Sequence, residues 1–405
     1  MRYAGLILFG GALVIAGGAS VAIGQAQAGG TATYWMTAET SSGMAAMMGA
    51  GAGGGGMGGM MRAMAGGRGA QSSYAHNLML QLGSGRRAAG APSAEHLVPA
   101  GLQAGPSLPL VTPQSAPLVS GPREPWQQGN MERPRGRMLI YWGCGEHARA
   151  GQPVVVDFAT MTAGRMPPAF ANANIHAMIP PSAARFTTYG EWPNQRSQTR
   201  VPAGGSLVGD HVVRGNYSPE IRFTLAPGQD FLAPVSLTSN TAGPSGSIPL
   251  VWRPISGARA WFLTAMGAAA NGDFIMWNSS ETQMLGMALD YLPEAELARL
   301  VQQRTLLPGT ADRCTIPVEV ARAAPQSMLS VIAFGGEANF SQPVRPARAP
   351  ASWRPDWTVK LRTKSTYMGL LGMNMPGMGD NQAQEPPPEQ PGSRLRRKLG
   401  KILGH

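Results

Sequence analysis

The sequence is poor in charge and in cysteine. Charged residues make up 14% of the 405 residues, and there are only two cysteines. Glycine and proline are abundant instead, with 54 and 35 copies. Because so many glycines and prolines do not fit inside packed helices and strands, we expect low-complexity segments beside the folded part of the chain.

Motifs that mark common enzyme families are absent as well. The sequence has no G-x-S-x-G, no Walker P-loop, no H-E-x-x-H and no G-x-G-x-x-G that opens a helix. Asp210 and His211 are adjacent in a glycine-flanked segment that we expect to be a loop, but no nucleophile motif accompanies them. Nothing in the sequence singles out a carboxylate pair for glycoside hydrolysis, because such partners meet only in the fold. We therefore predict a non-catalytic protein, with a hydrolase of unknown substrate as an alternative.

The N-terminus has the pattern of a secretory signal peptide. Arg2 supplies a positive charge, and residues 4–23 are uncharged and largely apolar. Ala26 and Ala28 have the small side chains that signal peptidase reads, which predicts cleavage before Gly29. An uncleaved membrane anchor is the alternative, because the apolar run approaches the length of a membrane span. We expect a periplasmic or extracellular protein of the type that Gram-negative bacteria export.

Cys144 and Cys314 are predicted to form one disulfide. An even cysteine count in an exported chain favours such a bond, because the compartment is oxidising. Cys144 also begins a Cys-Gly-Glu-His sequence, and Glu146 and His147 could join a thiolate in binding a metal or activating a nucleophile. No second Cys/His cluster supplies the remaining metal ligands, so we favour the disulfide beside ordinary polar residues.

Composition divides the chain into five segments. Residues 43–69 hold twelve Gly and seven Met, a stretch that loses much backbone entropy on folding and buries little. Residues 92–134 hold nine prolines, as an extended linker does. The predicted segments are a signal peptide at 1–28, a disordered Gly/Met- then Pro-rich segment at 29–136, a β-rich domain at 137–240, a second β-rich domain at 248–366, and a disordered tail at 367–405.

Short apolar or alternating runs between Pro/Gly turns predict strands from residue 137 onward. Residues 293–303 predict one helix, with proline at its first turn and Leu297, Leu300 and Val301 on one face. The predicted fold class is therefore mainly β, with two β-sandwich-like domains and one short helix, flanked by disordered low-complexity segments.

Residues 248–280 carry a spaced aromatic and turn pattern, formed by Leu250, Trp252, Pro254, Gly257, Ala258 and Trp261. This pattern is similar to the second and third strands of fibronectin type III-like sandwiches, in which the tryptophan lies in the core and an aromatic follows a Gly-Ala turn. The resemblance implies a β-sandwich over about 30 residues. It does not account for the helix predicted at 293–303, and it implies no functional residues.

Methionines gather near both ends of the chain. The candidate ligands are Met57, Met60, Met61, Met64, Met373, Met375 and Met378. They look like the methionine clusters of exported copper-handling proteins, because soft thioether sulfur suits Cu(I) and a flexible chain lets several ligands converge. A glycine-methionine low-complexity tract without any metal-binding role would have the same sequence, and no His-rich segment accompanies the methionines. We predict no cofactor, with copper as the alternative.

The net charge of +11 is concentrated toward the C-terminus, where the residues from 340 onward include 11 basic and 4 acidic side chains. The last twelve residues combine an apolar stripe with five cations: Arg394, Leu395, Arg396, Arg397, Lys398, Leu399, Lys401, Ile402 and Leu403. This basic amphipathic segment predicts binding to an anionic membrane surface, and a solvated tail is the alternative.

The overall charge also bears on the class of partner. An exported chain rarely meets nucleic acid, so we expect an anionic membrane surface or an acidic envelope polymer instead. The sequence names no protein partner. It predicts a structural or interaction protein of the periplasm or cell envelope, with a periplasmic copper-handling protein and a hydrolase as alternatives.

Overall fold

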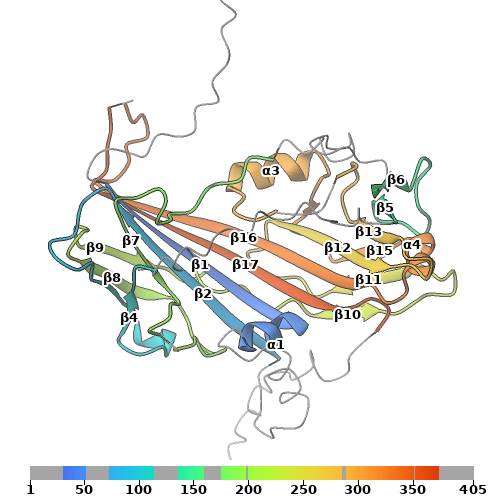
Figure 1. Ribbon diagram of the computed structural model, residues 1–405, viewed down its shortest axis with the longest axis horizontal. Coiled ribbons are helices and arrows are strands. Elements are labelled where there is room, and N and C mark those ends of the chain that lie inside the picture. The colour runs from blue at the N-terminus through green and yellow to red at the C-terminus, as the bar shows by residue number, and fades with distance from the viewer. Residues whose placement is uncertain are drawn as a thin grey trace, which may run out of the picture.

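The structure is mainly β, as the sequence predicts (Figure 1). It is a computed structural model, and it describes residues 31–51, 73–113, 136–158, 175–197, 199–284, 289–350 and 352–373. These residues form one large sheet of ten strands and two smaller sheets.

The large sheet runs the length of the molecule (Figure 1). Its strands follow one another in the order β6 (Val154–Asp157), β5 (Arg137–Trp142), β13 (Phe274–Asn278), β12 (Ala260–Ala268), β16 (Met328–Gln342), β17 (Trp357–Leu370), β1 (Ala32–Gly43), β2 (Tyr74–Ser84) and β7 (Thr188–Trp192), with β14 (Leu307–Pro308) paired to β12. Toward the β7 edge of the sheet, β1 pairs in parallel with β17 and antiparallel with β2.

Both smaller sheets pack against the same face of the large one. The first sheet contains β4 (Ser107–Leu110), β3 (Ala94–Leu97), β8 (Gly209–Gly215) and β9 (Ile221–Leu225), with a short 3-10 helix at Ala100–Leu102. The second sheet contains β10 (Leu237–Asn240), β11 (Ile248–Trp252) and β15 (Arg313–Ile316). Two apolar cores result, one under β1, β2 and β17 and the other under β12 and β16. The molecule is therefore a β-sandwich with one continuous and one divided layer.

Three α-helices accompany the sheets in the described part of the chain. The helix α3 (Glu294–Gln302) lies on the opposite face of the large sheet, where Leu297 and Leu300 pack with Phe262 and Phe334. It confirms the helix predicted at 293–303. The helix α4 (Val318–Ala323) adds apolar side chains to the second core, and α1 (Met44–Gly51) continues directly from β1. None of these helices has the length and apolar character needed to cross a membrane.

The expectation that residues 29–136 are disordered is wrong for much of the segment. This segment contains β1, α1, β2, β3 and β4. In β1, Tyr34 and Met36 point into a core while Thr37 and Glu39 point to the other face, which is the period-two pattern of a strand. The Gly/Met tract begins at the end of β1, so a stretch of low-complexity composition directly follows an ordered strand.

The strands also divide differently from the two predicted domains. Within the segment 137–240, β5 pairs with β13 of the large sheet, whereas β8 pairs with β3 of a small one. The last strand, β17, continues to Leu370, so folded chain extends past the boundary predicted at residue 366. The predicted signal peptide at 1–28 and the tail from residue 374 lie outside the described residues.

Candidate functional site

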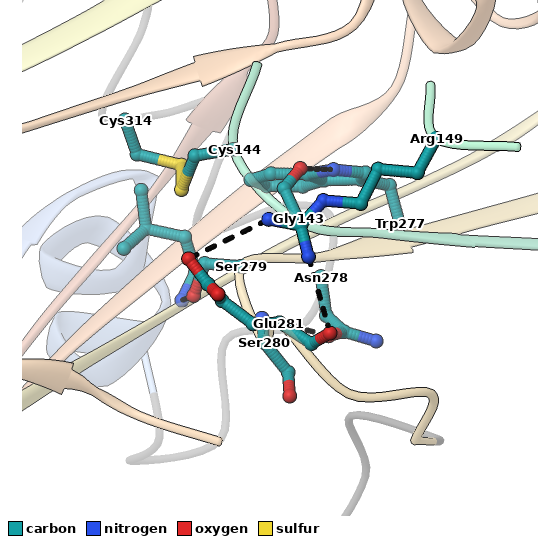
Figure 2. The surroundings of a disulfide bond; sticks show 10 residues. Gly143, Cys144, Arg149, Trp277, Asn278, Ser279, Ser280, Glu281 and Cys314 are labelled. Carbon is teal, nitrogen blue, oxygen red and sulfur yellow. Dashed lines mark hydrogen bonds and ion pairs between the residues drawn. A yellow bond between two sulfur atoms is a disulfide. The ribbon is translucent and has the colours of Figure 1, made fainter. Parts of the chain in front are cut away.

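Cys144 and Cys314 form the predicted disulfide, which joins the loop after β5 to β15 (Figure 2). The Gly143 amide donates to the Asn278 carbonyl at 2.9 Å, and the Gly143 carbonyl accepts from Trp277 Nε1 at 2.9 Å. Gly143 has a φ of 92°, a left-handed conformation that favours glycine. The loop is thus fixed to β13 as well as to β15.

The neighbouring Glu146 and His147 do not form a metal site with the cysteine. His147 Nδ1 lies 3.1 Å from Glu319 Oε1, and the Ala148 amide donates to Glu319 Oε2 at 2.8 Å. Within the residues that the structure describes, no group of three His, Cys, Asp or Glu side chains is arranged to hold a metal ion. The Cys-Gly-Glu-His sequence corresponds to a disulfide beside a histidine–carboxylate pair.

Asp210 and His211 lie in the strand β8 and not in the loop that the sequence predicts, and they point to opposite faces of it. The Asp210 carboxylate is exposed and accepts a hydrogen bond from Thr224 Oγ1 at 2.6 Å. The His211 ring is buried and stacks on Phe223, with ring centroids 4.9 Å apart. The two side chains therefore do not act together.

His211 belongs instead to a buried chain of hydrogen bonds with His96 and Tyr34. His211 Nε2 donates to the Leu207 carbonyl at 2.7 Å, so His211 Nδ1 accepts from His96 Nε2 at 3.0 Å. His96 Nδ1 then accepts from the Tyr34 hydroxyl at 2.8 Å. Burial lowers the pKa of both histidines, and for His96 the proximity of His211 lowers it further. Both rings are thus held neutral in a structural network.

The predicted methionine and membrane sites lie mostly beyond the described chain. Met373 is exposed and lies just beyond β17, which ends at Leu370. The other candidate copper ligands, Met57, Met60, Met61, Met64, Met375 and Met378, lie outside the described residues, as does the basic segment from Arg394 to Leu403. Copper binding and membrane binding both stay predictions.

The structure adds a site that the sequence did not indicate, a cavity of about 710 Å³ at one end of the large sheet. It lies where β16 and β17 meet β1 and β9, beside the β16–β17 connection, which projects beyond the sheet (Figure 1). Five aromatic side chains contribute to its wall: Trp35, Phe223, Phe340, Trp353 and Trp357. We call it the aromatic cavity.

The charged side chains of the aromatic cavity are all cationic. Its lining includes Arg222, Arg345 and Lys360 and no carboxylate. Arg222 Nη2 pairs with Glu220 Oε1 at 2.5 Å, and Lys360 pairs with Glu337, so both cations are compensated nearby. Arg345 makes no ion pair with any described residue, and its Cζ lies 5.5 Å from the Trp353 ring centroid in a cation–π contact. The uncompensated positive charge of the cavity therefore belongs to Arg345.

A charged face of the large sheet adjoins the cavity at Lys360. Alternate residues of β17 present cations there, and each is paired with a carboxylate from another segment; the charged face comprises Lys360, Arg362, Lys364, Glu337, Glu39 and Asp290. Arg362 is the most buried of the three cations and stacks on Tyr291, with its Cζ 4.4 Å from the ring centroid. Opposite charges therefore balance across neighbouring segments.

The ion pairs of the charged face shift the pKa of their members. Burial alone raises the pKa of Asp290, but nearby Lys364 and Arg362 outweigh it and the net pKa is lowered. Burial lowers the pKa of Lys364, but Glu39 and Asp290, each 3.2 Å from its Nζ, raise it overall. Both groups are stabilised in their charged forms.

No protein-family model, curated protein or solved structure matches this chain. The resemblance of residues 248–280 to a fibronectin type III-like sandwich therefore stays a prediction.

Proposed function

We propose that this chain is an exported, non-catalytic interaction protein of the bacterial periplasm or cell envelope, and that the aromatic cavity holds its partner. The observation that carries the proposal is the aromatic cavity itself. Concave sites with several aromatic side chains and a few polar groups are typical of ligand binding. Five aromatics around 710 Å³ provide such a surface.

Two further features support this assignment. The Cys144–Cys314 disulfide suits an oxidising compartment, where such bonds persist. The histidines and carboxylates described near the cavity are engaged elsewhere: His96 and His211 bond to each other, and Glu220 and Glu337 pair with cations. A binding role uses this arrangement directly, because it needs a shaped surface and no free acid or base.

Export is tested by expressing the full chain in a Gram-negative host. We expect the protein in the periplasmic fraction, with its N-terminus at Gly29 and with both cysteines resistant to alkylation until a reductant is added. Cytoplasmic protein with two reactive thiols would contradict the proposal.

The role of the cavity is tested by co-sedimentation of the mature protein with purified Gram-negative envelopes. We expect Arg345→Ala combined with Trp353→Ala to weaken binding roughly tenfold or more, as loss of a central aromatic and arginine does at other interfaces. Arg348→Ala is the matched control, because Arg348 is exposed on the same loop but is not part of the cavity lining. Equal binding by all three proteins, with unchanged thermal unfolding, would show that the cavity is not the contact.

A further inference from the structure

We infer that the partner held in the aromatic cavity is an acidic polysaccharide, a chain of sugars that carry carboxylates. This inference rests on the proposed function and names the ligand class. It is drawn from the charges of the lining, from one unpartnered donor and from the mixture of aromatic and polar side chains.

The charges of the lining favour a negatively charged ligand. Arg222 and Lys360 are already paired with Glu220 and Glu337, whereas Arg345 is exposed and has no carboxylate partner among the described residues. A guanidinium binds a carboxylate with two parallel N–H···O bonds, a geometry that an uncharged sugar does not offer. Arg345 is thus free to pair with a carboxylate on the ligand.

Trp353 supplies an unused hydrogen-bond donor beside Arg345. The indole nitrogens of three core tryptophans all donate to backbone carbonyls: Trp252 to Ala311, Trp261 to Gly309 and Trp277 to Gly143, at 2.9–3.0 Å. Trp353 Nε1, in contrast, is buried and has no hydrogen-bond partner among the residues that the structure describes. A buried donor without an acceptor is destabilising, and Trp353 lies in the cavity wall, so a turn of its ring that brings Nε1 to a ligand oxygen would satisfy this donor.

The remaining lining suits a sugar better than a lipid chain. The aromatic rings offer flat apolar faces on which the C–H faces of sugar rings pack. Between them lie the polar side chains of Asn339, Ser341, Gln342 and Thr358, which can donate to and accept from hydroxyl groups. A lipid tail would leave these polar groups without partners, whereas a polysaccharide satisfies them along with the rings.

The test is isothermal titration calorimetry of the mature protein with an oligogalacturonate, compared with a malto-oligosaccharide of the same length. We expect the acidic oligosaccharide to bind more tightly, by roughly tenfold, and more weakly as salt is added. Arg345→Gln should remove most of this preference, and Arg348→Gln should retain it. Trp353→Phe keeps an aromatic ring but removes the Nε1 donor, so it should weaken both ligands.

Three results would overturn the inference. The first is equal binding of the acidic and neutral oligosaccharides, and the second is binding of neither. The third is binding of anionic phosphatidylglycerol vesicles in place of the oligogalacturonate, lost on Arg345→Gln, which would assign a membrane surface. In each case cavity-dependent sedimentation with envelopes would still support the proposed function, so the failures of the two ideas are distinguishable.

Discussion

The two ends of the large sheet are stabilised in different ways. At the end formed by β12 and β13, apolar clusters cover both faces, with Trp261 and Leu263 in one and Phe262 and Leu297 in the other. The disulfide ties the adjacent β5 loop to β15. At the end formed by β1, β2 and β17, one face packs into an apolar core and the other bears the charged face.

Because of this difference, the groups that stabilise the fold and the groups that we expect to bind a ligand lie at different ends of the sheet. Apolar side chains stabilise wherever they are buried, so the clusters of the disulfide end need no precise polar geometry to hold the fold. Paired charges and buried histidines stabilise only in a defined geometry, and they leave polar and aromatic side chains near the surface. The aromatic cavity lies at this second end, which is where we expect binding variants to act with the least effect on folding.

Loss of the disulfide is expected to have the largest effect on stability. The bond joins residues separated by 170 positions. On the chain-entropy model, Cys144→Ser with Cys314→Ser should lower the free energy of unfolding by about 4–5 kcal/mol, an upper figure. Urea unfolding measures this change. A reductant should destabilise the wild type but not the double variant, and an unchanged urea midpoint would show that the disulfide end does not need its bond.

A core substitution in β2 should have the next largest effect. Leu80 is fully buried, whereas the adjacent Met79 is 44% exposed on the other face. Leu80→Ala should lower the free energy of unfolding by about 3 kcal/mol because it leaves a cavity, and Met79→Ala should change it by about 0.5 kcal/mol or less. Chemical unfolding of both variants tests the comparison. Equal, small effects would support the sequence-based expectation that residues 29–136 are disordered.

That expectation shows what local sequence can and cannot predict about this fold. Local periodicity predicts the mainly β class and the helix at 293–303. The disulfide follows from the count of two cysteines in the whole chain. The placement of β1 does not follow, because Ala32 pairs with Trp357, far along the chain. The sequence does place Tyr34 and Met36 on one face of a possible strand and Thr37 on the other. The neighbouring Gly/Met tract, however, favoured the prediction of a disordered segment.

The candidate site could be predicted even less well. The concentration of arginine, proline and tryptophan between residues 343 and 357 was a usable signal for Arg345 and Trp353. The partners of the β17 cations gave no such signal, because Glu39 and Asp290 come from distant segments. These long-range contacts decide which charges remain uncompensated. The ligand selectivity of the cavity can therefore be inferred only from the folded structure.

The buried histidine chain should give the cavity end a pH-dependent stability. The pKa values of His96 and His211 are lowered in the folded state, mainly by burial, from an unfolded value of about 6.5. The unfolded state therefore binds more protons, so stability is complete above pH ~6.5 and is lost as the pH falls toward the folded values. His96→Gln should lower the free energy of unfolding at neutral pH by about 1–3 kcal/mol and flatten its decline with acid.

Urea unfolding between pH 8 and pH 5 measures this dependence. His147→Gln is the control, because the His147 side chain is 70% exposed and lies at the disulfide end. It should keep the wild-type pH dependence. If His96→Gln keeps it too, the buried chain does not govern the acid sensitivity of the cavity end.

The smallest effect is expected from the ion pairs of the charged face. Asp290 contacts Arg362 and Lys364, and Asp312 contacts Arg313, and the two carboxylate side chains are 43% and 42% exposed. Their cations differ: Arg362 is 7% exposed and Arg313 is 75% exposed. Because Asp290→Asn leaves buried cations without a full partner, it should lower the free energy of unfolding by about 1 kcal/mol, and Asp312→Asn by about 0.3 kcal/mol or less.

The pH dependence of the same pair separates charge from packing. The pKa of Asp290 is lowered in the folded state, so its contribution is present above an unfolded value of about 3.9 and is lost as the pH falls below it. Urea unfolding at neutral pH and near pH 3 should thus show that the difference in unfolding free energy between wild type and Asp290→Asn becomes smaller in acid. Added salt should narrow it only slightly, since buried cations are poorly screened. An equal loss of unfolding free energy for Asp290→Asn and Asp312→Asn would mean that the charged face is held no better than an exposed ion pair. The contrast between the two ends of the sheet would then rest on the disulfide and on the apolar clusters that cover both faces at the disulfide end.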